Sequence, residues 1–310
     1  MGTEVRWLVT GARGMLGRDV VDTLLRQPGA VVTAADRAML DVTDPVAVAR
    51  LVAGHHVVVN TAGWTNVDAA EDAEDAATAV NGTAVAHLAR ACADSDARLL
   101  HISTDYVFSG TACAPYREHD ITGPVNAYGR SKLAGERELR RLLPERGYIV
   151  RTAWLYGEHG RNFVATMLAQ AAESPELRAV ADHTGQPTWS RALARQLVEL
   201  GQAAHGNVAP PGIYHGTSAG HSTWYDLTCA LFDLAGLDPR RVRPVPHTTF
   251  PRPAQRPTYG VLGHDGWGIA GVSPQARWRE QLAQALRTPA FAALAETARA
   301  RSPHLQTSGR

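Results

Sequence analysis

The sequence predicts an α/β protein in which a Rossmann-like, doubly wound parallel sheet is followed by a second, smaller α/β domain. Three observations support this fold class. Strand-like and helix-like segments alternate from residue 5 to residue 152, a glycine-spaced turn follows the first strand, and the pattern changes after Ala153. Helices that connect parallel strands of one sheet cross over it, and such crossovers are right-handed.

Five short apolar runs have the length and β-branched composition of buried strands. They lie at residues 5–10, 30–34, 56–60, 98–104 and 148–152. The stretches between them carry the apolar spacing of amphipathic helices. These helices are expected at residues 15–26, 46–52, 81–93 and 125–143. Strands and helices that alternate in this way form a parallel sheet covered on both faces.

The residues after Ala153 predict the second domain. Helices are expected at 162–173, 190–204, 224–235 and 274–286, with a lone strand at 212–215. The proline-rich segment 243–259 also carries aromatic and arginine side chains, which favours an ordered loop over a site. The expected divisions are a dinucleotide-binding domain over 1–153, a mainly substrate-binding domain over 154–300 with about 177–206 returning to the first domain, and a frayed tail over 301–310.

The overall composition excludes several classes of protein. The 31 basic residues nearly balance the 30 acidic residues, and no dense basic run occurs, so neither nucleic acid nor a membrane is an expected partner. No apolar stretch reaches the roughly 18 residues that span a membrane, and the first residues lack a signal-peptide pattern. Three cysteines without metal-type spacing predict no disulfide framework. We expect a soluble, cytoplasmic enzyme.

Gly11, Gly14 and Gly17 lie between the first predicted strand and the first predicted helix. Glycine here lets the chain turn sharply, lets a pyrophosphate approach the backbone and lets the helix pack closely on the sheet. Free N–H groups at the helix start, together with the helix dipole, favour phosphate. The predicted dinucleotide site comprises Gly11, Arg13, Gly14, Met15, Leu16 and Gly17.

The sequence leaves the type of nicotinamide cofactor open. Asp36 follows the second predicted strand, where a carboxylate accepts hydrogen bonds from the adenosine ribose of NAD. Arg37 beside it, or Arg13 in the glycine turn, can instead bind the 2′-phosphate of NADP. Both NADPH and NADH are therefore candidate cofactors. Asp41 and Val42 are expected beside the adenine, with a turn or helix-cap role as the alternative for Asp41.

Lys132 is the only lysine of the chain, and every other basic residue is an arginine. Tyr128 precedes it by one helical turn, so the two side chains lie on one face of a predicted helix. A free tyrosine titrates at about pH 10, and a nearby ammonium favours its phenolate. A compact ammonium with three donors can also hold ribose hydroxyls. The pair predicts proton transfer beside a nicotinamide; an arbitrary surface lysine is the alternative.

Thr104 ends the strand predicted at 98–104, at the sheet edge where open α/β sheets bind ligands. Its hydroxyl can donate to a substrate carbonyl oxygen or adjust the acidity of Tyr128. The alternative is a strand-end hydroxyl that bonds to the backbone.

Together these features resemble the extended short-chain dehydrogenases/reductases, and within them the dTDP-4-dehydrorhamnose reductase family. The resemblance covers about residues 5–290. The glycine turn and the tyrosine–lysine pair define only the superfamily, whereas STDYVF, RTAW and RPAQRP are specific to its sugar-nucleotide reductases. The matching segments after the glycine turn are 58–63, 65–71, 103–108, 128–136, 151–156, 162–163, 185–188, 212–215 and 252–257.

The resemblance implies hydride transfer from NADPH or NADH to C4 of a dTDP-linked 4-keto-6-deoxy sugar. It implies that Tyr128 gives its proton to the nascent alkoxide, that Lys132 supports Tyr128 and holds the nicotinamide ribose, and that Thr104 orients the carbonyl. The residues implied for the middle of the cofactor are Ala62, Gly63, Trp64, Thr65 and Ile102. The residues implied for the substrate are Thr104, Asp105, Tyr106, Trp154, Asn162 and Arg256. Core packing is the alternative for Trp154, and a solvated loop position is the alternative for Arg256.

The sequence departs from the family at one place. Some members dimerise around Mg²⁺ held by glutamates, one of them just past the glycine turn, where this chain has Arg18 and Asp19. We therefore expect no metal, and a monomer or a homodimer. The 13 histidines are expected to form no ligand cluster. The acidic run Asp68, Glu71, Asp72, Glu74 and Asp75 is expected to be a solvated helix start.

Two alternative functions remain from the sequence. One is a 4-ketoreductase of another dTDP-4-keto-6-deoxyhexose, as in antibiotic glycosylation, which delivers hydride to the other face of the ring. The second is a reductase-like regulatory subunit that keeps the fold for binding alone; the intact set of Thr104, Tyr128 and Lys132 argues against it.

Overall fold

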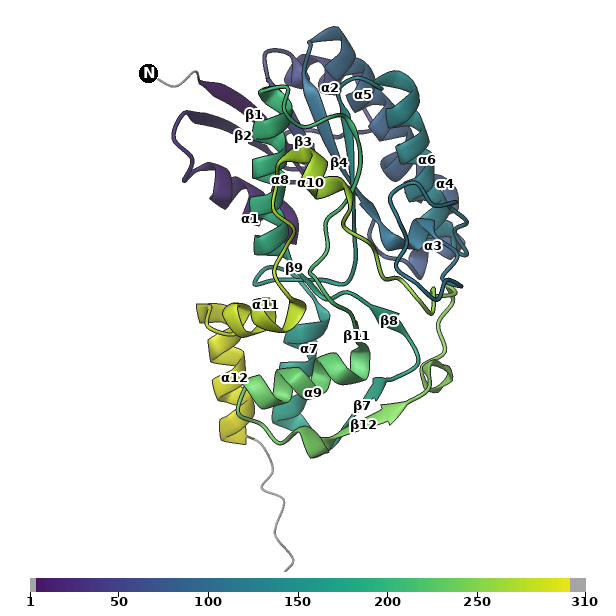
Figure 1. Ribbon diagram of the computed structural model, residues 1–310, viewed down its shortest axis with the longest axis vertical. Coiled ribbons are helices and arrows are strands. Elements are labelled where there is room, and N and C mark those ends of the chain that lie inside the picture. The colour runs from purple at the N-terminus through teal and green to yellow at the C-terminus, as the bar shows by residue number, and fades with distance from the viewer. Residues whose placement is uncertain (1–3, 302–310) are drawn as a thin grey trace, which may run out of the picture.

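A six-stranded parallel sheet forms the larger lobe of the computed structural model, which describes residues 4–301 (Figure 1). The strand order is β10-β5-β4-β3-β1-β2. The strands are β1 (Val5–Thr10), β2 (Ala30–Ala35), β3 (Val57–Asn60), β4 (Arg98–Thr104), β5 (Gly147–Thr152) and β10 (Gly212–His215). The strand order reverses at β1, which has β2 on one side and β3 on the other, so the ligand crevice of such sheets is expected at their carboxyl ends. The predicted fold class is confirmed.

Helices cover both faces of this sheet. The helices are α1 (Met15–Leu24) and α8 (Ser190–His205) on one face and α2 (Pro45–Val52), α5 (Ala84–Asp94) and α6 (Ala127–Leu142) on the other. Strand side chains alternate between the two cores: Trp7 and Val9 pack with the first pair of helices, whereas Leu8 packs with the second group. The short helix α10 (Gly266–Ala270) packs beside β10 through Trp267.

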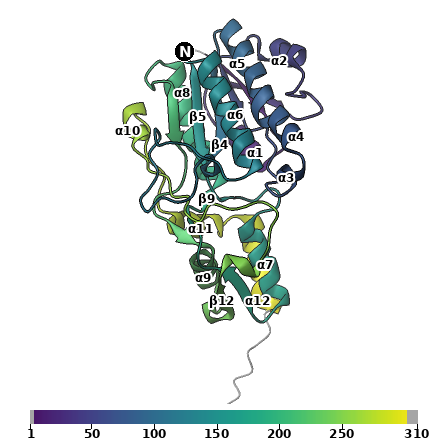
Figure 2. The same cartoon turned by 90° about the vertical axis from the view of Figure 1, so that its right-hand side faces the viewer.

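The second lobe, of helices and short strands, lies below the sheet lobe in Figures 1 and 2. It has its own hydrophobic core. Its helices are α7 (Phe163–Glu173), α9 (Trp224–Leu234), α11 (Trp278–Ala285) and α12 (Pro289–Arg301). Its two-stranded pairs are β7 (Leu177–Val180) with β12 (Val242–Val245), β8 (Thr184–Gly185) with β11 (Ser222–Thr223), and β6 (Leu155–Tyr156) with β9 (Thr188–Trp189). No helix among residues 4–301 has both the length and the apolar composition needed to cross a bilayer.

Several elements differ from the sequence-based expectations. The lone strand is the sixth strand of the sheet, because Gly212–His215 pairs in parallel with β5. The last predicted helix begins only at Trp278, and α12 was not predicted. The helix expected from residue 81 is preceded by α3 (Ala69–Asp72), α4 (Glu74–Thr78) and the π-helical turn η1 (Ala79–Thr83). The expected tail lies outside the described residues from 302 onward.

A buried ion pair fixes helix α6 on the sheet. Arg151 of β5 makes two hydrogen bonds to the Glu136 carboxylate, at 2.9 and 2.6 Å, and both side chains are 2% exposed. The Ser103 hydroxyl of β4 donates to the same carboxylate at 2.5 Å, and a third Arg151 nitrogen donates to the Glu118 carbonyl. The charges are tolerated because hydrogen bonds surround them.

We predict that Arg151→Met lowers the free energy of unfolding by about 3–5 kcal/mol, because Glu136 is then an unpaired buried carboxylate. Urea unfolding followed by circular dichroism measures the change. Arg141→Met is the matched control, since Arg141 pairs with Glu138 on the surface and such pairs contribute about 0–1 kcal/mol. Equal losses in the two variants would contradict the prediction.

Candidate functional site

The glycine turn brings β1, α1 and the segment after β3 into close contact. Gly11 has φ +67°, a left-handed conformation that favours glycine. A Cβ on Gly11 would lie 2.7 Å from the backbone nitrogen of Ala62. A Cβ on Gly17 would meet the Gly11 carbonyl oxygen and would lie 2.8 Å from the Thr61 hydroxyl. Larger residues are therefore excluded at both positions.

Helix α1 starts at this turn without a side-chain cap. Gly14 is the residue before the helix, and its N–H donates to the Gly11 carbonyl at 2.9 Å. The first N–H groups of a helix have no acceptor within it, and here no side chain supplies one. The N–H groups of Met15 and Leu16 thus lie at the carboxyl end of β1 in an arrangement that fits a pyrophosphate.

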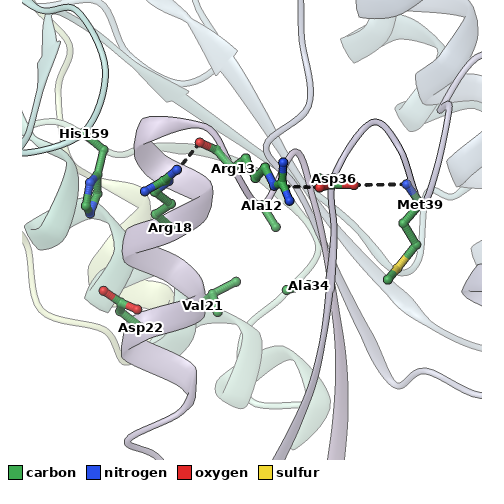
Figure 3. A pocket seen from close by; sticks show the side chains of 9 residues that line it. All are labelled: Ala12, Arg13, Arg18, Val21, Asp22, Ala34, Asp36, Met39 and His159. Carbon is green, nitrogen blue, oxygen red and sulfur yellow. Dashed lines mark hydrogen bonds and ion pairs between the residues drawn. The ribbon is translucent and has the colours of Figure 1, made fainter.

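Arg13 and Asp36 form an ion pair at a pocket of about 500 Å³ beside the ends of β1 and β2 (Figure 3). Arg13 Nε lies 2.7 Å from Asp36 Oδ2, and the Arg13 side chain is 81% exposed. The other oxygen of Asp36 accepts the backbone N–H groups of Ala38 and Met39, both at 3.0 Å. Both oxygens of the expected ribose acceptor therefore already have partners. Arg37 is exposed.

Asp41 and Val42 have mainly local contacts. Asp41 Oδ1 accepts the hydroxyl and the backbone N–H of Thr43, at 2.7 and 3.0 Å, and these bonds lower the pKa of the carboxyl. Val42 is buried in the core under α2 and α5. The residue that caps α2 is Asp44. The geometry thus favours the turn alternative for Asp41, and a contact with adenine stays a prediction.

Gly63 leaves room for the Lys132 ammonium beside β3. A Cβ on Gly63 would lie 2.9 Å from Lys132 Nζ and 3.1 Å from Asn81 Oδ1. The buried Asn81 joins two segments: its Oδ1 accepts the Trp64 N–H at 2.9 Å, and its Nδ2 donates to the Trp64 carbonyl and to Ser131 Oγ. Asn81 therefore positions the segment after β3 against α6.

Lys132 is buried at the carboxyl end of β4. Its Nζ donates to the Ile102 carbonyl at 3.1 Å, which occupies one of the three donors of an ammonium. Burial lowers the pKa of Lys132 to about 8, and the Glu136 carboxylate partly opposes this change. Thr65, two residues after Gly63, is also expected at the cofactor, and it is exposed.

Tyr128 lies in the first turn of α6, close to the end of β4. Burial raises the pKa of its phenol, a hydrogen bond with Thr104 opposes the rise, and the charge of Asp105 adds to it. The phenol is therefore protonated at neutral pH, as a proton donor requires. The hydrogen bond with Thr104 lowers the pKa of Tyr128. An effect of the Lys132 ammonium on that pKa stays a prediction. The ring packs edge-to-face on Tyr106 at 5.8 Å.

Asp105 follows Thr104 and is buried. The Thr104 hydroxyl donates to Asp105 Oδ1 at 3.0 Å, and burial raises the pKa of this carboxyl to about 7. The second carboxylate oxygen of Asp105 lies 2.5 Å from the position that a Cβ on Gly260 would occupy. Thr104 also accepts the Tyr106 N–H, so its hydroxyl serves both the predicted site and the local backbone.

The loop that carries Arg256 is held over this region by Asp68. Arg256 lies 2.9 Å from Asp68 Oδ1, and Arg252 lies 3.6 Å from Oδ2. Arg256 is mostly buried, and its guanidinium lies 6.0 Å from the centre of the Tyr106 ring. Asn126, which caps α6, donates to the Gln255 carbonyl at 2.7 Å. The solvated alternative for Arg256 therefore does not apply.

Two residues expected at the substrate are engaged with the protein. Trp154 has φ +45°, and its ring stacks on Trp224 with 3.5 Å between ring centres, while the Gly185 backbone lies against the same indole. Asn162 caps α7 by accepting the Ala165 N–H, and its amide nitrogen donates to two backbone carbonyls. One face of Trp154 is thus covered, and contacts of either residue with substrate stay predictions.

The structure adds contacts to two sequence-based expectations. The acidic run is not simply solvated: Asp68 holds the Arg256 loop, Glu71 accepts the Ala127 N–H, and Glu74 pairs with Arg130. Two of the histidines, His183 and His247, lie beside Asp182 in a group whose ligand atoms are close enough to hold a metal ion. Contacts between residues far apart in the chain were needed to see both features.

Asn81 was also missed, although it stands as a buried polar residue in an alanine-rich stretch. Such a residue needs hydrogen-bond partners, and that need was the available signal. Asp19 is buried as well, and its carboxylate accepts the Ser190 hydroxyl at 2.5 Å. Burial raises the pKa of Asp19.

Comparisons with known proteins show the family of this chain. Residues 5–290 match the family model described as RmlD substrate binding domain. A dTDP-4-dehydrorhamnose reductase of Streptomyces griseus is 51% identical over 90% of this chain and 92% of its own. A dTDP-4-keto-6-deoxy-D-glucose reductase of Streptomyces niveus is 50% identical over 90% and 96%. The crystal structure of dTDP-4-dehydrorhamnose reductase from Bacillus anthracis, in complex with NADP, has a TM-score of 0.86 at 32% identity and covers 92% and 99% of the two chains.

The parallel sheet, the glycine turn and the tyrosine–lysine pair are features of the superfamily, and the family match with the named relatives makes this chain an NAD(P)-dependent oxidoreductase of sugar nucleotides. The similarity extends over both lobes and not only over the six-stranded sheet. The chain belongs to the dTDP-4-dehydrorhamnose reductase family.

We predict that kcat/KM falls above pH about 8, because Lys132 loses its proton there. The folded-state pKa lies below the ordinary value of 10.5, so the unfolded chain binds more protons between these values and stability rises with pH in that window. Lys132→Arg should lose most of the activity, and its residual activity should lack this fall. The same alkaline fall in both proteins would contradict the assignment.

Proposed function

We propose that this protein reduces the C4 ketone of dTDP-4-dehydro-L-rhamnose to dTDP-L-rhamnose with NADPH or NADH. The observation that carries the proposal is the cluster of Thr104, Tyr128 and Lys132 at the carboxyl end of β4, beside the glycine cradle at Gly63. The nicotinamide supplies the hydride that reduces the ketone carbon. The names of the relatives in Streptomyces griseus and Bacillus anthracis support the sugar.

Tyr128 holds the proton that the reaction consumes. Its phenol stays protonated because burial and the nearby Asp105 carboxyl disfavour the phenolate. When the substrate oxygen gains charge, Tyr128 donates this proton, and the Thr104 hydroxyl turns from Asp105 to donate to the phenolate that remains. Placed catalytic acids of this kind typically contribute about 10²–10⁴-fold in rate.

Lys132 has a different role in this proposal. Its buried ammonium offers donors beyond the one that the Ile102 carbonyl accepts, and these face the opening left by Gly63. They suit the hydroxyls of the nicotinamide ribose. Because the sheet lobe carries these groups, it is assigned to the dinucleotide, and the second lobe with the Arg256 loop is assigned to the sugar nucleotide. Arg256 suits the substrate diphosphate because a guanidinium matches phosphate geometry.

The Arg13–Asp36 pair bears on the choice of cofactor. Asp36 is the group that would select NAD, but Arg13 neutralises it and leaves a largely exposed guanidinium at the same pocket. A guanidinium there suits the 2′-phosphate of NADPH. We therefore propose NADPH as the preferred cofactor, with NADH accepted.

A second candidate is the 4-ketoreductase of a different dTDP-4-keto-6-deoxyhexose. The relative from Streptomyces niveus favours it, because it is named for a different keto sugar at nearly the same identity as the first relative. The same side chains serve both reactions, which differ in the face of the ring that receives hydride.

We also propose that the protein works in the cytoplasm, as a monomer or a homodimer.

We predict that purified protein oxidises NADPH when given dTDP-4-dehydro-L-rhamnose, and that NMR of the product shows the C4 configuration of rhamnose. Tyr128→Phe should lower kcat by about 10²-fold or more because the proton donor is removed, while leaving cofactor affinity unchanged. Tyr225→Phe, a substitution of a partly buried tyrosine on α9 away from the site, is the control. The opposite C4 configuration would assign the second candidate, and full turnover by Tyr128→Phe would refute the mechanism.

We further predict that Arg13→Ala raises the KM for NADPH by at least about tenfold and changes the KM for NADH little, since a charge-assisted bond to phosphate contributes roughly 1.5–3 kcal/mol. Steady-state kinetics with both cofactors measure the two values. Arg50→Ala, at an exposed arginine on α2, is the control. Parallel changes with both cofactors would argue against a 2′-phosphate contact.

A further inference from the structure

The second lobe carries a cluster of side chains that the reductase site does not use. Asp182, His183 and His247 each offer one ligand atom, and the three atoms lie within 4.8 Å of one another. Imidazole and carboxylate are ligands that late first-row metal ions accept, whereas Mg²⁺ and Ca²⁺ favour sets of oxygen atoms.

The topology of a strand pair brings this cluster together. Strands β7 and β12 are parallel, with Val180 opposite Val245, and the Ala181 N–H donates to the Val245 carbonyl at 3.0 Å. Asp182 and His183 follow the end of β7, and His247 follows the end of β12. Because parallel strands end at the same edge, the fold itself places the three residues side by side.

The contacts within the cluster leave one buried nitrogen without a partner. Asp182 accepts the backbone N–H of His247 at 3.0 Å and contacts its ring nitrogen Nδ1 at 2.9 Å. The rings of His183 and His247 stack with 4.9 Å between their centres. His183 is 8% exposed, and its Nε2 makes no hydrogen bond within residues 4–301. Buried polar atoms normally have partners, so this nitrogen is available to a ligand.

We propose that Asp182, His183 and His247 bind one Zn²⁺ ion, or a similar late first-row divalent ion, with water completing the coordination. At metal–ligand distances of about 2.0–2.2 Å the ligand atoms of a tetrahedral site lie about 3.3 Å apart, so they must move closer together. The Asp182 and His247 side chains are 41% and 51% exposed and can rotate toward the buried His183.

The ion would link the start of the Arg256 loop, at His247, to the segment that follows β7. The loop leaves β12 just before His247 and returns at Thr258, whose carbonyl accepts the Thr184 N–H at 2.8 Å. The Gly260 N–H then donates to the Thr184 carbonyl. Both ends of the loop therefore meet the segment that follows β7, and the ion would join its first end to that segment.

Calorimetric titration of the full-length, untagged, chelator-stripped protein with ZnCl₂ tests the proposal. We expect one Zn²⁺ per chain, not displaced by MgCl₂. His247→Gln should weaken Zn²⁺ binding by roughly 100-fold or more, since even outer partners of metal ligands contribute about 10–100-fold. His221→Gln, which removes an exposed histidine outside the cluster, is the matched control and should bind as the wild type does.

Two further measurements separate this site from binding elsewhere. The Co²⁺-loaded protein should show visible d–d bands without thiolate charge-transfer absorption, which excludes the exposed Cys113 as a ligand. Zn²⁺ should raise the Tm of the wild type but not of His247→Gln. Because His183 is buried, the exposed His247 carries the test, and circular dichroism checks that the variant folds.

Three results would overturn the proposal: no stoichiometric binding of Zn²⁺, equal affinity in the wild type and His247→Gln, or a thiolate signature with Co²⁺. In the first two cases the Asp182–His247 hydrogen bond alone explains the cluster. None of these measurements involves catalysis, so their outcome is independent of the proposed reductase function.

Discussion

The placement of helix α6 on the sheet depends on the buried contact between Glu136 and Arg151. The two charges are removed from water, and such a pair is tolerated only when its geometry and hydrogen bonds are complete. Ser103 and the Glu118 carbonyl complete them here, and the Arg151 guanidinium also lies over the Phe108 ring. An apolar contact would allow the helix to slide or rotate, whereas a forked ion pair between β5 and α6 defines one orientation.

Two glycines on α6 let the helix pack closely against neighbouring backbone in this orientation. A Cβ on Gly129 would collide with the Tyr106 carbonyl, and one on Gly135 would collide with the Asn81 carbonyl. The helix therefore approaches both the end of β4 and the π-helical turn η1 without intervening side chains. Tyr128 and Lys132, one turn apart, reach Thr104 and the Ile102 carbonyl from this close position.

Burial acts on three titratable groups in this region in the same sense, because it disfavours the charged form. It raises the pKa of Tyr128, raises that of Asp105 to about 7 and lowers that of Lys132 to about 8. In a buried region of this kind a phenol keeps its proton and can donate it. It also makes the charge on the lysine sensitive to what binds beside it, since its one internal acceptor is a backbone carbonyl.

The sequence was sufficient for features that depend on local patterns. The strands of the sheet, the glycine turn and the Tyr128–Lys132 spacing follow from periodicity and residue type, and the fold class was predicted correctly. The sequence was insufficient for features that depend on contacts between residues far apart in the chain. Whether Gly212–His215 joins the sheet depends on its pairing with β5, and the partners of Asp68 and His183 lie more than 60 residues away.

The fold of the second lobe was harder to predict for a related reason. Its strands contain two to four residues each, too few to show an alternating pattern, and they are defined by their partners. Trp154 shows the same limit at a single residue. The family resemblance of its segment implied a binding role, but the stacked Trp224 that covers one face comes from a helix in another part of the chain.

The single lysine of this chain gives the molecule an intrinsic label. Reagents that modify amines, or isotopes introduced by reductive methylation, can mark only the chain's one ε-amino group besides the terminal amine. In most enzymes such signals overlap among many surface sites. Here one ε-amino resonance would report on the buried Lys132 beside the end of β4, so its protonation can be followed without any amino-acid substitution.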